Sequence, residues 1–166
     1  MEALGRLFDV SIGSVPTDAV AGAITGKRVS LKNASGCTIL VVTTGASTDI
    51  TDVDLQQHTA SSGGTTADLD IIDHYYYKSE ATLDGDETWT RATQTAASEI
   101  TNVGAASEEL LLAIEVNAAS LSDGYSYISL DIPDLGTNGT RHCSILYVLH
   151  GLRFPRKPAN LVAPLS

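Results

Sequence analysis

The stretch from Ser107 to Phe154 constrains the fold of this chain more than any other segment. It holds three apolar runs, ELLLAIEVN, SYISLDI and CSILYVLH, which turn residues separate. In the first run every second residue from Leu110 to Val116 is aliphatic, whereas the residues between them are of mixed polarity. This alternation predicts a β-strand with one face fully buried and the other face partly buried.

The other two runs differ in how apolar their two faces are. In the second run Ile128, Leu130 and Ile132 alternate with more polar residues, which predicts a strand with one wet face. The third run, residues 143–149, is apolar on both faces. We therefore expect this strand in the middle of a sheet, covered on both sides.

Turn signals predict two hairpins. Pro133 ends the second run because proline has no N–H to donate, and Asn138-Gly139 accepts a positive φ at low cost. The segments RVSLKN and CTILVVTTG flank a similar turn at residues 33–36. The second and third runs are expected to pair with each other, and so are these two segments.

Alternating patterns elsewhere raise the expected total to about eight strands. Three of them lie within residues 49–60, 68–81 and 87–97, and residues 92–106 also read as a connection that is rich in Ala, Thr and Ser. A helix around Ile71–Tyr76 is the alternative for one segment, but its three consecutive tyrosines favour a strand. The chain is expected to form an all-β, antiparallel β-sandwich or jelly roll with extended terminal arms.

Three parts are expected along the chain. Residues 1–26 read as an N-terminal arm or first strand, residues 27–154 as the β-sandwich domain, and residues 155–166 as an extended, proline-rich C-terminal tail. At 166 residues the chain is long enough to bury roughly 70% of the surface that its unfolded form exposes. Cys37 and Cys143 lie inside apolar runs, so we expect inert buried thiols, and a disulfide between packed strands is the alternative.

Charge and hydropathy limit the classes of partner. The net charge is −10, and residues 49–134 carry 17 acidic residues against Lys78 and Arg91, whereas residues 135–166 carry four basic residues and no acidic one. An acidic body repels phosphates, so nucleic acid is not an expected partner. A membrane is not expected either, because the N-terminus lacks the pattern of a signal peptide and no run approaches about 20 apolar residues. We expect a soluble protein that is made in a cytoplasm.

Catalytic and metal-binding patterns do not emerge from the sequence. Loops that start at Asp52, Asp68 or Asp84 all fail the EF-hand spacing, although loop carboxylates can gather around calcium in other geometries. His142 and His150 are roughly 27 Å apart along an extended strand, too far to share a metal. The sequence lacks a G-x-S-x-G elbow, a Walker loop and a G-x-G-x-x-G motif. We expect no cofactor and no enzymatic activity, although a carboxylate pair for glycoside hydrolysis is a property of the fold and stays open.

The residues above carry one resemblance to a known group of proteins. The chain after about residue 25 resembles small head decoration or cement proteins of tailed bacteriophages. The matching elements are an IEV-N strand at Ile114–Asn117, Gly124-Tyr125, a turn at 134–138 and a closing strand at Tyr147–Phe154. The resemblance is one of pattern, and Phe154 stands where a tyrosine is expected.

The resemblance implies a non-enzymatic virion protein that decorates or cements the capsid shell at the junctions between capsid subunits. Its expected partners are the major capsid protein and further copies of itself, as a dimer or trimer, and its expected location is the capsid surface after synthesis in the host cytoplasm. The residues expected to bind these partners lie in the two arms: Leu4, Leu7, Phe8, Val10, Phe154, Arg156, Lys157, Leu161, Val162 and Leu165.

A carbohydrate-binding β-sandwich of a fibre or adsorption protein is the alternative. Tyr75–Tyr77, Tyr125, Tyr127 and Trp89 could form a sugar platform next to loop aspartates. Half of the tyrosines must face inward by alternation, which favours a mixed role in the core and at an interface.

Overall fold

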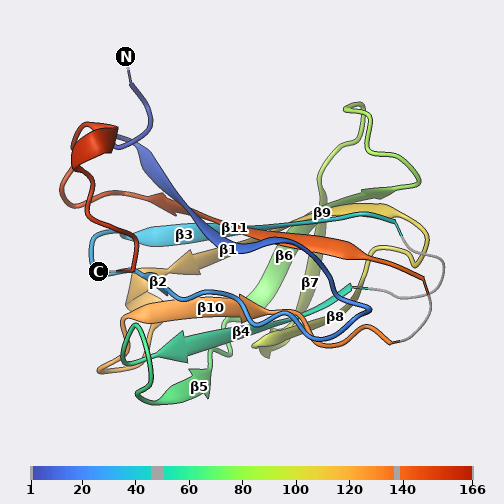
Figure 1. Ribbon diagram of the computed structural model, residues 1–166, viewed down its shortest axis with the longest axis horizontal. Coiled ribbons are helices and arrows are strands. Elements are labelled where there is room, and N and C mark those ends of the chain that lie inside the picture. Colours follow the sequence, from blue (N-terminus) through green and yellow to red (C-terminus); the bar gives the residue numbers. More distant parts are fainter. Residues whose placement is uncertain (1, 46–50, 137–138, 166) are drawn as a thin grey trace.

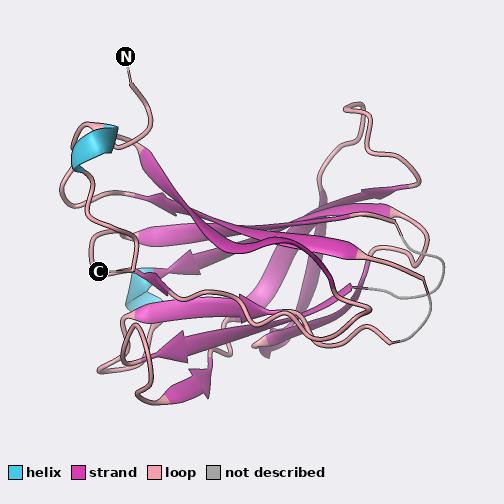
Figure 2. Cartoon of the chain, in the orientation of Figure 1, coloured by secondary structure: helices cyan, strands magenta, loops and turns pink. Residues whose placement is uncertain are grey.

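The protein is a two-layered β-sandwich (Figure 1). The computed structural model describes residues 2–45, 51–136 and 139–165. All strand pairs are antiparallel, and the helical content of these residues is limited to two 3-10 turns, Ala118–Ser120 and Pro158–Asn160 (Figure 2). Within the described ranges no helix is long and apolar enough to cross a membrane. The predicted all-β sandwich is confirmed.

One layer is a six-stranded sheet whose central strands come from the apolar runs of the sequence. Its order is β1-β11-β3-β9-β6-β7. The strands are β1 (Phe8–Asp18), β11 (His142–His150), β3 (Gly36–Thr43), β9 (Glu109–Asn117), β6 (Ile72–Glu80) and β7 (Thr90–Ala97).

The other layer is a five-stranded sheet built from shorter strands. Its order is β2-β10-β4-β5, and β8 also pairs with β4. The strands are β2 (Val29–Ser30), β10 (Tyr127–Asp131), β4 (Thr51–His58), β5 (Thr66–Asp68) and β8 (Glu99–Val103).

The chain crosses between the two sheets at most of its connections, and this overturns both predicted hairpins. β2 pairs with β10, whereas β3 pairs with β9 and β11, so the segments around residues 33–36 lie in different layers. β10 and β11 also belong to different sheets. The connection from β10 to β11 therefore crosses between the layers, and Asn138 of the predicted turn falls outside the described residues. Turn residues mark where a strand ends, but they do not decide which strand becomes its neighbour.

The core lies between the layers and consists of the alternate residues that the strand patterns place inward. In β9 the residues Leu110, Leu112, Ile114 and Val116 are at most 2% exposed, as predicted. Tyr147 of β11 reaches across the core, where its hydroxyl oxygen accepts a 3.0 Å hydrogen bond from the backbone N–H of Leu130. This bond links the two layers and gives an acceptor to a backbone N–H that would otherwise be buried without one.

Three other predictions need correction. The described residues form eleven strands instead of about eight, and β5 and β8 are among those that were not predicted. Residues 92–106, expected as a connection, contain the end of β7 and all of β8. The outer face of β10 is not wet, since Tyr127 is 6% and Ser129 is 2% exposed. β11 has neighbours on both sides in its sheet, but only its inner face is fully covered. The errors for β10 and β11 concern coverage by distant segments, which a strand pattern does not encode.

The two cysteines are free and buried, as expected. Cys143 faces Thr43 across the β11–β3 ladder, whereas Cys37 faces Leu149 at its other end, so the two thiols lie about 20 Å apart. Burial raises the pKa of Cys37 to about 12 and that of Cys143 to about 11. Both thiols therefore stay protonated and unreactive at neutral pH.

Candidate interaction surfaces

The two ends of the chain meet at one end of the sandwich (Figure 1). The backbone N–H of Arg156 donates to the carbonyl oxygen of Gly5 at 2.8 Å, and the N–H of Ser30 donates to that of Pro164 at 2.7 Å. Gly5 has a φ of 78°, and a Cβ at this position would overlap the carbonyl oxygen of Arg156. We call residues 2–8 and 152–165 the terminal lobe. The two segments predicted as separate arms are thus packed against each other and against the domain.

Most of the predicted partner-binding residues are gathered in this lobe. Leu4 forms a bridge with Phe8, which begins β1, and Leu161 packs near Gly5. Val10 lies outside the lobe, on the outer face of β1. The lobe exposes five large apolar side chains: Leu4 (41%), Leu7 (63%), Phe154 (60%), Val162 (41%) and Leu165 (48%).

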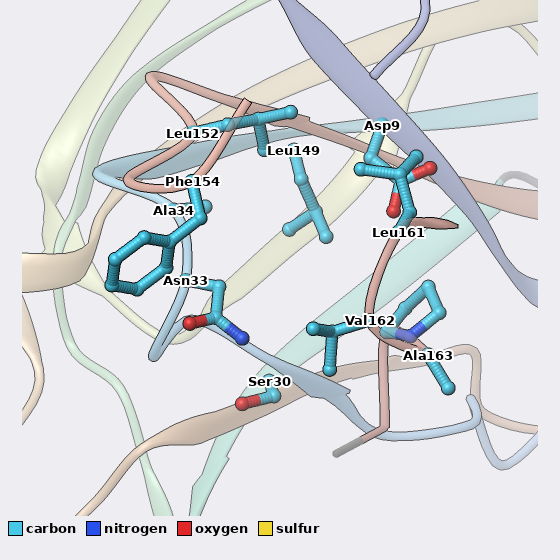
Figure 3. Close-up of a pocket in the computed structure, with 11 residues that line it drawn as sticks. Asp9, Ser30, Asn33, Ala34, Leu149, Leu152, Phe154, Leu161, Val162 and Ala163 are labelled. Atoms are coloured by element: carbon cyan, nitrogen blue, oxygen red, sulfur yellow. The ribbon is translucent and has the colours of Figure 1, made fainter. Parts of the chain in front are cut away.

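A small cavity lies beneath the lobe, lined by Asn33, Ala34 and Leu149 of the domain and by Phe154, Leu161 and Val162 of the tail (Figure 3). Its volume of about 30 Å³ is the space of one or two water molecules. The tail therefore closes over the domain and leaves no room there for an organic ligand.

The terminal lobe is also the cationic end of an acidic protein. Arg6, Arg153, Arg156 and Lys157 are all exposed there, and the lobe contains a single acidic residue, Glu2. A surface that combines exposed apolar and cationic side chains is suited to bind an acidic protein surface.

A second surface, the outer face of the six-stranded sheet, is apolar across five strands. The register places Ile12 beside Leu146, Leu146 beside Leu40, and Leu40 beside Ala113 in one continuous row. The rows on either side of it are mixed, since one also contains Thr38 and Glu115 and the other also contains Ser144 and Lys78. We call the following residues the sheet face: Val10, Ile12, Leu40, Val42, Tyr76, Leu111, Ala113, Leu146 and Val148.

The side chains of the sheet face are open to solvent to different degrees. Val10, Ile12 and Val42 are 41%, 47% and 41% exposed, and most of the others are half-buried by their own neighbours. Sequence reasoning did not propose these residues as a binding site, apart from Val10. The sequence did contain an indication of this surface, because the third apolar run is apolar on both faces and was therefore expected to be covered on both.

The outer face of the five-stranded sheet is different, because it is polar and internally bonded. His58 Nδ1 and Nε2 lie 2.9 Å from the hydroxyl oxygens of Thr66 and Ser129, respectively. Arg28 donates to the carbonyl oxygens of Ala60 and Gly63 in the loop between β4 and β5. Burial, followed by the charge of Arg28, lowers the pKa of His58 to about 4. The two outer faces of the sandwich thus have opposite characters.

An acidic hollow of about 340 Å³ lies beside the five-stranded sheet, where three carboxylates sit on adjacent strands. Asp54 is directly opposite Asp131 on one side and Glu99 on the other. Burial, with the charge of Asp54 as a further cause, raises the pKa of Asp131. Like charges in this register destabilise the sheet, so protonation of Asp131 relieves repulsion here.

A second acidic groove lies between β6, β7 and the loop before β9. It has a volume of about 460 Å³ and includes Tyr77, Glu80, Glu87 and Glu108 in its lining. Carboxylate oxygens of Glu80, Asp86 and Glu87 lie within 4.8 Å of one another. Burial and then the neighbouring carboxylates raise the pKa of Glu80. Such oxygens are the ligands that hard cations prefer, but exposed acidic groups also cluster without an ion.

The aromatic residues do not form one platform. The rings of Tyr75 and Tyr77 are 6.2 Å apart on the inner side of β6, whereas Tyr76 belongs to the sheet face. Tyr127 is buried, and Trp89 is 47% exposed beside the ammonium group of Lys78.

The histidines expected not to share a metal are also dispersed. His58 is buried in the five-stranded sheet, His74 contacts Asp73, and His142 and His150 lie at opposite ends of β11.

Comparisons with family models, with curated proteins and with solved structures find no match to this chain. The resemblance to phage decoration proteins therefore stays a prediction from the sequence pattern.

Proposed function

We propose that this protein is a non-enzymatic structural protein of a tailed-phage virion that decorates or cements the capsid at the junctions between capsid subunits. The observation that carries the proposal is the terminal lobe, where five exposed apolar side chains lie among four exposed cations. The sequence pattern of the closing strands, which resembles that of head decoration proteins, supplies the identity of the partner.

The physical basis of binding is burial of the apolar side chains of the lobe, on the order of 25 cal/mol per Å² before ordering costs are subtracted. Those costs are small because the tail is already packed on the domain and three of its residues, Pro155, Pro158 and Pro164, restrict its backbone. The cations direct the lobe towards acidic surfaces of the major capsid protein. The acidic remainder of the chain keeps nucleic acid away.

Purified phage heads that lack this protein provide the test. Leu7→Ser and Phe154→Ser should each lower head occupancy about tenfold at a fixed protein concentration, because each removes an exposed apolar anchor of the lobe. Val15→Ser is the matched control, since Val15 is 56% exposed towards the opposite end of β1. Equal occupancy for all three variants and the wild type would refute the role of the lobe.

Point substitutions are preferable to removal of residues 155–166. The tail covers Leu149 and Ala34 and accepts a hydrogen bond from Ser30, so its removal would expose the domain as well as remove the binding surface.

The acidic groove favours a second candidate function, carbohydrate binding. Tyr77 offers an aromatic ring, and Glu80, Glu87 and Thr90 offer hydrogen-bonding groups within the same 460 Å³ space. A glycan array in which the wild type binds and Tyr77→Ala does not would support this function. Absence of glycan binding by the wild type would remove it.

A further inference from the structure

We infer that a hollow beside the terminal lobe binds the carboxylate of an acidic protein segment. The hollow has a volume of about 260 Å³, and its lining includes Leu31, Lys32, Leu121, Tyr125 and Arg153. Arg153 belongs to the terminal lobe as well as to this lining. The inference therefore deepens the proposed function, and it rests on that function for one point, that the partner of the lobe is an acidic protein.

The hollow is assembled from three segments that are distant in sequence, around residues 31, 121 and 153. Backbone hydrogen bonds join them: the N–H of Leu31 donates to the carbonyl oxygen of Ser126 at 2.9 Å, and the N–H of Arg153 donates to that of Asn33 at 2.9 Å. The walls are thus in place before a ligand binds, which lowers the ordering cost of binding.

The charges in the hollow are of one sign. Lys32 and Arg153 are both exposed, and the described residues that line the hollow include no acidic side chain. Neither cation forms an ion pair within the described part of the chain, where the ion pair is that of His74 with Asp73. In a chain with a net charge of −10, a carboxylate that enters this hollow gains two cationic neighbours and meets no acidic one.

The position of the Lys32 ammonium group is fixed by Tyr127. Its Nζ donates to the phenol oxygen of Tyr127 at 3.2 Å and lies 5.0 Å from the centre of the same ring. Tyr127 is buried, so its ring is a firm support for the lysine. An ammonium group has three N–H donors, and the bond to Tyr127 engages one of them. The other two are available to a carboxylate.

The remainder of the lining favours an acidic side chain over a neutral sugar. Leu31 is 2% exposed and Leu121 packs against the core, so this part of the hollow is apolar. Sugar hydroxyl groups need acceptors as well as donors, whereas the cationic groups of Lys32 and Arg153 only donate. A glutamate side chain can lay its methylene groups on the apolar part and present its carboxylate to the cations.

The location of the hollow indicates that its ligand belongs to a protein partner of the terminal lobe. Phe154, which is 60% exposed in the lobe, directly follows Arg153. A protein that covers Phe154 therefore lies within reach of the Arg153 guanidinium, which can bind a carboxylate through two parallel hydrogen bonds. The exposed apolar side chains then supply most of the affinity, and the carboxylate in the hollow fixes the orientation of docking.

Titration of the full-length chain with a blocked tetraglutamate peptide, followed by NMR, tests the inference. The peptide should bind with a dissociation constant of about 1 mM or lower. Lys32→Met and Arg153→Met should each raise this constant about fivefold, because each removes a charge-assisted hydrogen bond. Arg6→Met is the matched control, since it removes the same charge from the lobe outside the hollow, and it should change the constant less than about twofold.

Three results would overturn the inference. The first is no binding of the peptide up to about 10 mM. The second is equal weakening by Arg6→Met and Arg153→Met, which would mean that the peptide is attracted by the whole cationic end. The third is binding of glucuronate without binding of the peptide, which would assign the hollow to an acidic sugar.

Two further measurements keep these outcomes distinct. Circular dichroism verifies the fold of each variant, and Lys32→Gln replaces Lys32→Met if the latter does not fold. Head occupancy is measured on the same proteins. A wild type that binds the peptide but not the heads would refute the capsid proposal alone, whereas one that binds the heads but not the peptide would refute the role of the hollow alone.

Discussion

Arg141 lies in an environment that its position in the sequence does not indicate. It belongs to the cationic segment of residues 135–166, yet it is fully buried directly before β11. Its Nη1 donates to the carbonyl oxygen of Ala106 at 3.2 Å, and its Nη2 donates to that of Glu108 at 3.0 Å. Its Nε and Nη2 also donate to the hydroxyl oxygen of Thr43. The guanidinium thus joins β11, the end of β3 and the loop before β9.

Replacement of this guanidinium should be costly. We expect Arg141→Met to lower the free energy of unfolding by about 3 kcal/mol, because it removes the donor to the buried hydroxyl oxygen of Thr43 and to the carbonyl oxygens of Ala106 and Glu108. Arg141→Lys should recover little of the loss, since an ammonium group does not reproduce the planar fork. Urea denaturation measures both variants. Arg153→Met, at an exposed position, should change stability by less than about 0.5 kcal/mol, and similar values for Arg141→Met and Arg153→Met would contradict this role.

At the scale of elements, the terminal lobe depends on the close approach of two segments that are about 150 residues apart in sequence. Gly5 permits this approach because it has a positive φ and no side chain next to Arg156. Gly124 has a similar φ of 85°, but nothing lies within 4 Å of the position that its Cβ would occupy.

A comparison of substitutions at Gly5 and Gly124 distinguishes the effect of backbone strain from the effect of steric overlap. Gly5→Ala should destabilise the protein by at least about 2 kcal/mol or detach the tail, whereas Gly124→Ala should cost about 1 kcal/mol from its φ alone. Thermal unfolding measures the stability, and limited proteolysis after Arg153 and Arg156 measures detachment of the tail. Equal effects of the two substitutions on both measurements would show that the lobe does not require this contact.

The alternating patterns predicted individual strands correctly where one face of the strand is buried and the other is not. β9 has the predicted inner face, and β6 is a strand rather than the alternative helix. The predicted pairing of β2 with β3 and of β10 with β11 was wrong, because a turn between two strands is compatible both with a hairpin and with a crossing between layers. The sheet face was recognised only as a strand with two apolar faces, since its extent depends on the order of five strands.

At the scale of the whole molecule, the polar outer face of the five-stranded sheet makes stability depend on pH. His58 lies between β5 and β10, and its pKa is lowered from 6.5 to about 4 in the folded state. As the pH falls from 6.5 to 4, the unfolded chain binds a proton that the native state does not. The free energy of unfolding should therefore fall across this window, by on the order of 2 kcal/mol, and His58 should contribute no further change below about pH 4.

Chemical denaturation at pH 7, 6, 5 and 4 measures this dependence. His58→Gln should show a shallower decline than the wild type, and His142→Gln, at an exposed site, should show the same decline as the wild type. Asp131 acts in the opposite direction, because its raised pKa makes the native state bind a proton first, so the difference between variants is the relevant quantity. If His58→Gln left the pH profile unchanged, the imidazole would take up its proton in the folded protein over the same pH range as in the unfolded chain.

The sequence by itself determined the all-β class, most of the strands, the inner face of β9 and the inert thiols. These properties follow from local alternation between polar and apolar residues, which each strand carries within itself. Only the tertiary structure decided which strands are neighbours, that the two ends of the chain form one lobe, that Arg141 is buried, and that one outer face is polar while the other is apolar. The physical reason is that each of these properties depends on segments distant in sequence that lie side by side, and a period of two residues specifies only which way a side chain points.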